Sequence, residues 1–262
     1  MIGSEHKGGR AMKEERRKQM GSVIAQKQSM TMEQLVEYFG VSMNTIRADV
    51  AYLVKTGAVE KIYGGVRAAE HKQVPLFASR AMENTAQKKR IAMAAEAHIE
   101  DHDIIFIDAG TTTMHLLDYL SKTKHVTVVT ASLYVIQQAA AMDNVTLIVL
   151  PGTANRRTNA LGDVGTLEYL SRYRFNKAFM GVSGISEDGR LNVSTYIEYE
   201  IKRTAMKQSQ ENFLLVDTAK FGSSGLMSYG QVEDMTAMIT DHTCPDFVRT
   251  LCKDANIPLF EV

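Results

Sequence analysis

The chain of 262 residues has little cysteine, no long apolar run and no net charge. Its two cysteines, Cys244 and Cys252, fall in one predicted helix and make a poor disulfide pair, so nothing indicates an oxidising compartment. No apolar run reaches the roughly 20 residues needed to cross a bilayer, and the polar N-terminus lacks a signal-peptide core. The sequence therefore predicts a cytoplasmic protein without a membrane partner.

Residue patterns typical of metal and nucleotide sites are also missing. Of the seven histidines only His98 and His102 have a ligand-like spacing, and a solvated helix end explains this pair better than a zinc site does. The loop 108–113 lacks the glycine spacing and the lysine of a Walker loop, which disfavours a nucleoside triphosphate. We therefore expect no metal and no cofactor.

The charges are unevenly distributed although they sum to zero. Residues 12–67 carry nine Lys and Arg against six Asp and Glu, a net charge of +3, and residues 1–11 add +1, so residues 68–262 carry −4. A basic head on a mildly acidic body fits a nucleic-acid-binding head joined to a body with another role. The total length also favours two domains.

Residues 12–67 have the pattern of a helix-turn-helix followed by a wing. A first helix is predicted over 13–28, and Thr31 with Gln34 predicts a capping box at the start of a second helix. Gly40 is typical of the residue that ends such a helix. The glycine turn within Val59–Arg67 predicts a two-stranded wing.

The third predicted helix begins after Ser42 and runs to about Thr56. Its apolar residues Ile46, Val50 and Leu53 recur at i, i+4 and i+7 and should pack inward. The outward residues near its start, with one wing lysine, form the predicted DNA-binding set: Ser42, Asn44, Thr45, Arg47 and Lys61. Hydroxyls and lysine suit phosphates, whereas asparagine and arginine can read base edges. Asp49 is expected to form a salt bridge to a neighbouring helix rather than to contact DNA. The alternative for the whole head is a three-helix bundle that binds another protein.

The third helix and the wing together resemble a known family. The motif Ser42-x-x-Thr45-Ile46-Arg47-x-Asp49, followed by Gly64-Gly65, is similar to the head of DeoR-family transcriptional regulators. Family members usually have a second arginine where this chain has Ala48. Base reading is therefore expected to depend on Arg47, Asn44 and the wing.

The body alternates short apolar segments with amphipathic ones. The predicted strands are 104–107, 126–130, 145–150, 177–181, 213–216, 237–240 and 259–262, and the predicted helices are 85–100, 133–141, 164–173, 195–210 and 245–255. This alternation predicts an α/β body whose mostly parallel sheet is covered on both faces. Residues 68–84 contain Pro75 and no clear period, which predicts a linker, and residues 1–11 are taken as an extension.

Small and polar residues gather where the predicted strands end, which is where α/β sheets bind ligands. The predicted effector-binding residues are Asp108, Gly110, Thr111, Thr112, Thr113, Thr130, Ser132, Gly152, Gly181, Gly184, Glu198 and Lys220. Hydroxyls and backbone N–H groups could hold a phosphate, carboxylates could accept hydroxyl protons, and Lys220 could neutralise a phosphate. A plain helix start capped by Thr111 explains the 108–113 loop equally well.

The body also resembles the same family. The motifs Asp108-x-Gly110-x-Thr112, Gly181-x-x-Gly184-Ile185, Asp188-Gly189 and Asp217-x-x-Lys220-Phe221-Gly222 are similar to the DeoR sensor domain, which belongs to the ribose-5-phosphate isomerase and CoA-transferase group of folds. The resemblance implies a winged helix-turn-helix DNA-binding domain over 12–67 and an effector-binding sensor over 85–262. It also implies a phosphorylated sugar or related metabolite that is bound without turnover.

The sequence thus predicts a transcriptional regulator, most simply a repressor of a carbohydrate uptake or catabolism operon. Its expected partners are a double-stranded DNA operator and a phosphorylated sugar effector. Two-fold operators need two heads, which predicts a homodimer or higher homo-oligomer. The alternative is a sugar-phosphate isomerase or deaminase that carries an accessory helix-turn-helix head.

Overall fold

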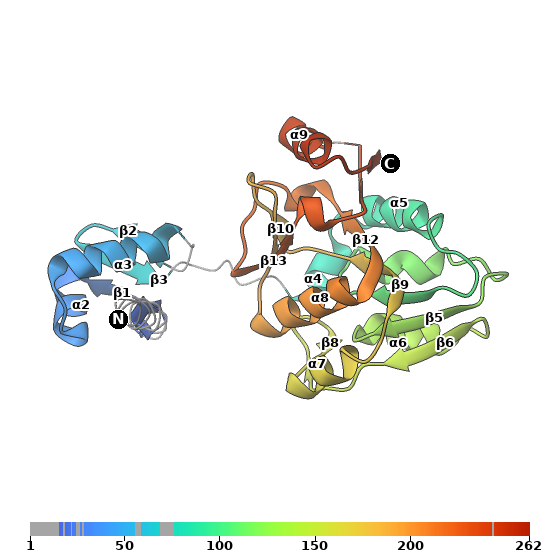
Figure 1. The fold of residues 1–262 in the computed structure, drawn as a ribbon, viewed down its shortest axis with the longest axis horizontal. Coiled ribbons are helices and arrows are strands. Elements are labelled where there is room, and N and C mark those ends of the chain that lie inside the picture. Colours follow the sequence, from blue (N-terminus) through green and yellow to red (C-terminus); the bar gives the residue numbers. More distant parts are fainter. Residues whose placement is uncertain are drawn as a thin grey trace, which may run out of the picture. The chain divides into compact units, whose positions relative to one another are not determined.

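The computed structural model describes residues 16–17, 19–21, 23–24, 27, 29–55, 59–68, 76–242 and 244–262. The chain divides into two compact units, residues 1–73 and residues 74–262 (Figure 1). Each unit has a hydrophobic core of its own. The expected N-terminal extension, 1–11, lies outside the described residues.

The first unit is a winged helix-turn-helix. Its described residues between 16 and 27 are helical. The elements that follow are β1 (Ser29–Thr31), α2 (Met32–Phe39), α3 (Met43–Lys55), β2 (Val59–Ile62) and β3 (Gly65–Ala68). The strands form an antiparallel sheet in the order β1-β3-β2. The predicted two-stranded wing therefore gains a third strand, which is too short to show an alternating pattern.

Local capping explains where α2 begins and ends. The Gln34 N–H donates to the Thr31 hydroxyl over 3.2 Å, and the Thr31 N–H donates to the Gln34 side chain over 2.9 Å, which confirms the predicted capping box. Gly40 adopts a left-handed conformation with φ of 61° and donates its N–H to the Val36 carbonyl over 2.9 Å. Most side chains disfavour that conformation, so the predicted stop at Gly40 is also confirmed.

The second unit is built on a seven-stranded sheet in which all neighbouring strands are parallel. Its strands are β4 (Ile104–Ile107), β5 (Val126–Thr130), β6 (Val145–Val149), β9 (Phe175–Met180), β12 (Ser209–Val216), β14 (Ala237–Thr240) and β15 (Leu259–Glu261). The order across the sheet is β15-β14-β12-β9-β4-β5-β6. The predicted parallel α/β body is therefore confirmed.

Helices cover both faces of this sheet, as the near-continuous apolar strands require (Figure 1). One core layer packs under α5 (Thr85–Glu96), the 3₁₀ helix η1 (Thr113–Asp118) and α6 (Leu133–Ala139). The other packs under α7 (Val164–Leu170), α8 (Tyr196–Gln208) and α9 (Asp246–Asp254). Along β4 the residues alternate between the layers, with Phe106 in one and Ile105 and Ile107 in the other.

Several short elements do not appear in the sequence expectations. The helix α4 (Phe77–Met82) lies within the expected linker 68–84, and Phe77 is buried and donates its N–H to the Arg157 carbonyl over 3.0 Å. A second sheet joins β10 (Gly184–Ile185), β11 (Arg190–Val193) and β13 (Met227–Gln231), and β7 (Ala154–Asn155) pairs with β8 (Ala160–Leu161). The strands β7, β8 and β10 have two residues each, which is too short for an alternating pattern, and β13 joins β11 from a distant part of the chain.

The structure also places the two cysteines and bears on the expected lack of a membrane-spanning segment. Cys244 lies before α9 and only Cys252 lies within it; both are free thiols. In the described part of the chain no helix is both long and apolar enough to cross a membrane.

Candidate functional site

The start of α3 presents the residues predicted to meet DNA. Ser42, Asn44 and Arg47 are exposed and Thr45 is half-buried. The Ser42 hydroxyl accepts the Thr45 N–H over 3.3 Å and lies 2.9 Å from the Thr45 hydroxyl, so Ser42 caps the helix as predicted. Among the described residues no hydrogen bond or ion pair engages the Asn44 or Arg47 side chain, which leaves both available to a partner.

The opposite side of α3 packs against the other helices of the head. Ile46, Val50 and Leu53 are buried in its core, which confirms the predicted inward face. Asp49 is fully buried and accepts hydrogen bonds from Arg16 Nε and Arg17 Nε, each over 2.7 Å. The predicted salt bridge from Asp49 to a neighbouring helix is confirmed. It holds α3 in place without using the exposed face.

The wing is held against β1 and the start of α2. Gly64 has a φ of 75°, and its carbonyl accepts the Met32 N–H over 3.1 Å at the start of α2. A Cβ on Gly65 would lie 2.4 Å from the Met30 carbonyl oxygen, so only glycine fits there. Lys61 on β2 is exposed, which suits the predicted phosphate contact.

In the body the strand order reverses between β4 and β9. From β4 the chain proceeds outward through β5 and β6, and from β9 it proceeds outward in the other direction. Such a switch point opens a crevice at the carboxyl ends of the two strands, where parallel sheets bind ligands. The residues that follow these strands are Asp108 and Gly181, and the Gly181 N–H donates to Asp108 Oδ2 over 3.1 Å.

A cavity of about 50 Å³ occupies this crevice. Its polar and small lining residues include seven of the twelve predicted ones, Asp108, Gly110, Thr111, Thr112, Gly181, Glu198 and Lys220. Lys202 from α8 forms an ion pair with Asp108 and donates to the Gly181 carbonyl over 2.9 Å. Both charged side chains are almost fully buried, so the pair is held by the fold.

The loop after β4 is closed on itself, and its residues Thr111 and Thr112 line the cavity. The Thr113 hydroxyl accepts the Gly110 N–H over 3.0 Å and donates to the Asp108 carbonyl over 2.7 Å. Among the described residues, none accepts the N–H of Thr111 or Thr112. The helix that follows is a six-residue 3₁₀ helix whose cap residue, Thr112, makes no side-chain cap bond. Thr111 is therefore not the cap that the plain-helix alternative supposed.

Five predicted residues do not line the cavity, and each has a structural place instead. They are Thr113, Thr130, Ser132, Gly152 and Gly184. The Thr130 hydroxyl donates to the Ile107 carbonyl over 2.6 Å, and the Ser132 hydroxyl caps α6. A Cβ on Gly152 would lie 2.7 Å from the Gly162 nitrogen, and one on Gly184 would lie 2.5 Å from the Ser223 carbonyl oxygen. Sequence alone could not separate such packing roles from ligand contacts.

Among the side chains at the cavity that were not predicted, two cations and one tyrosine bear on its chemistry. Lys202 lies four positions after Glu198, so helical spacing on one face of α8 could have revealed it. Arg80 reaches the cavity from α4. Tyr229 donates its hydroxyl to the Gly181 carbonyl over 3.0 Å, and burial, followed by the nearby Asp108 charge, raises the pKa of that hydroxyl. No local pattern marks Arg80 or Tyr229.

A buried polar group anchors α4 and α5 near the cavity. Lys88 Nζ donates to the Arg80 carbonyl, and Asn84 Nδ2 donates to Asp217 Oδ1 over 3.0 Å. Burial lowers the pKa of both Lys88 and Arg80, and the nearby carboxylates oppose this effect. Asp217 precedes Lys220, so the contact with Asn84 joins α5 to the strand end that carries the cavity lysine.

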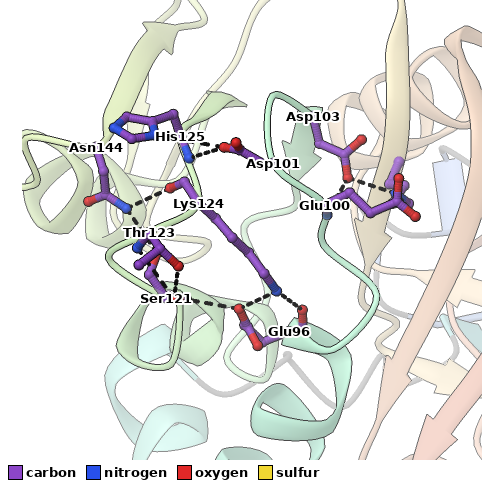
Figure 2. Close-up of polar contacts among 10 residues, drawn as sticks. Glu96, Glu100, Asp101, Asp103, Ser121, Thr123, Lys124, His125 and Asn144 are labelled. Atoms are coloured by element: carbon purple, nitrogen blue, oxygen red, sulfur yellow. Dashed lines mark hydrogen bonds and ion pairs between the residues drawn. The ribbon is translucent and has the colours of Figure 1, made fainter.

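A second polar cluster lies at the amino ends of the strands (Figure 2). Lys124 pairs with Glu96 over 2.8 Å, and Asn144 Nδ2 donates to the Lys124 carbonyl over 2.8 Å. Asp101 accepts the His125 N–H over 2.6 Å, and this bond lowers the pKa of the Asp101 carboxyl. The contacts tie loops to α5 and build no concave site, so we assign them to stability.

The expected absence of a metal site can be examined at the histidine pair. His98 is half-buried, and its ring packs at a tilt against Phe213 and Phe260, with ring centroids 4.7 and 5.2 Å away. His102 is exposed, so the expected solvated helix end describes only that member of the pair. Within the described ranges no group of three or more His, Cys, Asp or Glu is arranged to hold a metal.

Comparison with known proteins agrees with this architecture. The family profile of the DeoR C terminal sensor domain matches residues 83–242, and that of the DeoR-like helix-turn-helix domain matches residues 16–72. The HTH-type transcriptional regulator IolR of Bacillus subtilis is 35% identical over 94% of this chain and 98% of its own length. The glycerol-3-phosphate regulon repressor of Escherichia coli is 28% identical over 90% of this chain and 94% of its own length.

Solved structures give more distant matches. The probable sor operon regulator from Shigella flexneri matches with a TM-score of 0.45 at 11% identity, covering 63% of this chain and 89% of that one. A ribose 5-phosphate isomerase from Methanocaldococcus jannaschii matches with a TM-score of 0.40 at 17% identity, and the match spans about half of each chain, 53% and 55%.

The curated relatives are transcriptional regulators and not enzymes, so the alternative of an isomerase or deaminase with an accessory head is set aside. Both halves of the chain match the same family, in the order in which the two units occur. The chain therefore belongs to the DeoR family of transcriptional regulators.

Proposed function

We propose that this regulator represses a sugar uptake or catabolism operon and that a phosphorylated sugar or related metabolite controls it from the cavity between β4 and β9. The observation that carries the proposal is the cavity at the switch point of the sheet, which is lined by threonines, cations and two carboxylates, those of Asp108 and Glu198. Relatives named as a glycerol-3-phosphate regulon repressor and as an L-fucose operon activator support a sugar-linked role, and the repressor sign is taken from the first of them.

The DNA-binding side of the proposal rests on α3 and the wing. Asn44 and Arg47 would read base edges, and Ser42, Thr45 and Lys61 would contact phosphates. Two such heads in a homodimer or higher homo-oligomer would match a two-fold operator.

The effector side rests on complementary chemistry around the cavity. The N–H groups of Thr111 and Thr112 and the cations Arg80 and Lys220 suit a phosphate. The carboxylates of Asp108 and Glu198 accept hydrogen bonds, which suits the hydroxyl groups of a sugar. A phosphorylated polyol satisfies both ends of the cavity at once.

The cavity is too small for such a ligand in the conformation described. A volume of about 50 Å³ compares with roughly 300–1,000 Å³ for typical small-molecule sites. Binding must therefore displace lining groups, and Arg80 is the lining residue nearest in sequence to the head. Because Lys88 and Asn84 join α4 and α5 to the same region, a shift of Arg80 would reach the segment that leads to the head. The effector would then bias the population of DNA-competent molecules.

A thermal-shift screen of sugar phosphates and their unphosphorylated counterparts tests the proposal. A ligand that binds only the native state raises the melting temperature, so we expect stabilisation by some phosphorylated compounds and none by the free sugars. Lys220→Met should abolish the shift, whereas Lys253→Met, at an exposed position on α9, should leave it unchanged. Release of operator DNA on addition of the same compound, followed by fluorescence anisotropy, would support repression.

Two results would refute the effector assignment. One is equal stabilisation by free and phosphorylated sugars. The other is a full response in Lys220→Met. If the effector tightens operator binding instead of weakening it, only the proposal that the effector releases the regulator from DNA is refuted.

A further inference from the structure

The two edges of the seven-stranded sheet differ in how well they are protected. At one edge β15 has only three residues, and its Glu261 is held by Arg249 over 2.6 Å. At the other edge β6 has the sequence Val-Thr-Leu-Ile-Val and pairs with β5 alone (Figure 1). Short length and charge are devices that prevent edge-to-edge pairing. β15 has both, and β6 has neither.

The backbone of β6 has a free hydrogen-bonding side. The Leu150 N–H donates to the Thr130 carbonyl, and the Asn144 carbonyl accepts the Val126 N–H. Backbone groups alternate sides along a strand, so the even-numbered residues face β5. The N–H and C=O groups of Leu147 and Val149 therefore point away from the sheet, and no described strand pairs with them.

The side chains of β6 are also incompletely covered. None of its five residues is fully buried, and Val149 is 40% exposed. The strand carries no charge, proline or glycine that would oppose pairing with another strand. An uncovered apolar edge of this kind is an aggregation site unless a specific partner occupies it.

We propose that β6 is the interface between two copies of this chain, which pair through it antiparallel across a two-fold axis. Two-fold symmetry requires reciprocal contacts, and antiparallel strands exchange both of their bonds reciprocally whereas parallel strands do not. An uncharged strand meets its own copy without repulsion, so β6 is self-complementary. The pairing joins two seven-stranded sheets into one continuous sheet.

A second copy is the occupant because the function calls for one. Helix-turn-helix proteins that bind as dimers read two half-sites related by two-fold symmetry, and the proposed function needs two such heads. The inference rests on the proposed homo-oligomer and specifies which surface forms it. An extended peptide from another protein is the competing occupant, and it would leave the isolated chain monomeric.

The mass of the full chain in solution, measured by light scattering after size exclusion, provides the test. We expect the wild type at a multiple of 29.1 kDa. Val149→Lys places a charge on the free edge, and Val149→Pro removes an outward N–H without breaking a bond to β5, so each should halve the mass. The matched control Val164→Lys, at an 82% exposed valine on α7, should keep the wild-type mass.

Hydrogen exchange resolved to single amides identifies the contact directly. In the wild type the amides of Leu147 and Val149 should be protected by at least tenfold over the same amides in Val149→Lys. If both Val149 variants fail to fold, this wild-type protection decides the question, because unpaired edge amides exchange rapidly.

The outcomes separate the interface from the wider proposal. A monomeric wild type overturns both the interface and the homo-oligomer. It does not bear on effector binding, which the thermal-shift screen tests separately. A wild-type oligomer with unprotected Leu147 and Val149 amides, or with a mass unaffected by Val149→Lys, overturns the interface alone.

Discussion

Replacing Asp49 by alanine should unfold the DNA-binding head while the body stays folded. In the structure the carboxylate of Asp49 is fully buried and binds Arg16 and Arg17. Removing one partner of a buried ion pair costs about 3–5 kcal/mol, because a charge is left uncompensated. Since the arginine side chains keep 24% and 15% of their exposure and can turn toward water, we expect the lower end, about 3 kcal/mol.

This loss is comparable with the whole stability of the head. At about 0.05–0.15 kcal/mol per residue, the predicted DNA-binding domain, residues 12–67, has roughly 3–8 kcal/mol in total. The head of Asp49→Ala should therefore be partly or fully unfolded at ambient temperature. The second unit has separate cores and should not be affected.

Urea titrations of the full chain, followed by far-UV circular dichroism, would measure the effect. DNA binding should be lost in Asp49→Ala, and stabilisation by the effector should be kept. The matched control Asp188→Ala breaks an exposed pair with Arg190 and should cost no more than about 1 kcal/mol. If Asp49→Ala unfolds at the same urea concentration as Asp188→Ala and still binds DNA, the buried ion pair does not hold the recognition helix in place.

Three further predictions concern DNA, effector and pH. Arg47→Ala should weaken specific duplex binding at fixed salt by about 1–3 kcal/mol in anisotropy titrations, and unchanged affinity would remove Arg47 from the readout. Thr112→Ala and Gly110→Val should abolish sugar-phosphate binding in calorimetry but keep DNA binding, since a Cβ on Gly110 would lie 2.9 Å from the Thr113 hydroxyl; normal calorimetric binding would contradict this. Burial raises the pKa of Cys244 to about 12 and of Cys252 to about 11 from an ordinary 9.0. Because the folded-state pKa values are raised, the two thiols contribute their full stability to the fold below pH 9, and this contribution is lost as the pH rises from 9 to 12. The urea midpoint should therefore fall over that range, and it should fall less steeply in Cys252→Ala. Equal slopes in the two proteins would count against the burial argument.

The head could be predicted closely because its signals are local. A capping box spans three residues, and the inward face of α3 repeats within a few turns, so neighbours in sequence fix both features. The strand β1 escaped prediction because its three residues become a strand only through pairing with β3. The predicted wing was therefore correct in position and incomplete in extent.

In the body, the residues at strand ends could be predicted, whereas the long side chains that reach the cavity from helices could not. Asp108 and Gly181 could be found because parallel strands bring their carboxyl ends together, whatever the details of packing. Lys202 and Arg80 reach the cavity from helices, and their direction depends on how α8 and α4 pack. Thr130 and Ser132 stand at the same edge but turn into the fold, a choice that hydrogen bonding makes after the strands are in place.

The order of the sheet also has a consequence for synthesis of the chain. The interior strand β4 is made early, and its neighbour β9, the central strand of the sheet, begins only at Phe175. At roughly 5–20 residues per second, one side of the apolar run Ile104–Ile107 stays open on the ribosome for several seconds. Asp108 meets Gly181 only after this interval, so the edge that later forms the cavity is first the part of the nascent body most exposed to misassociation.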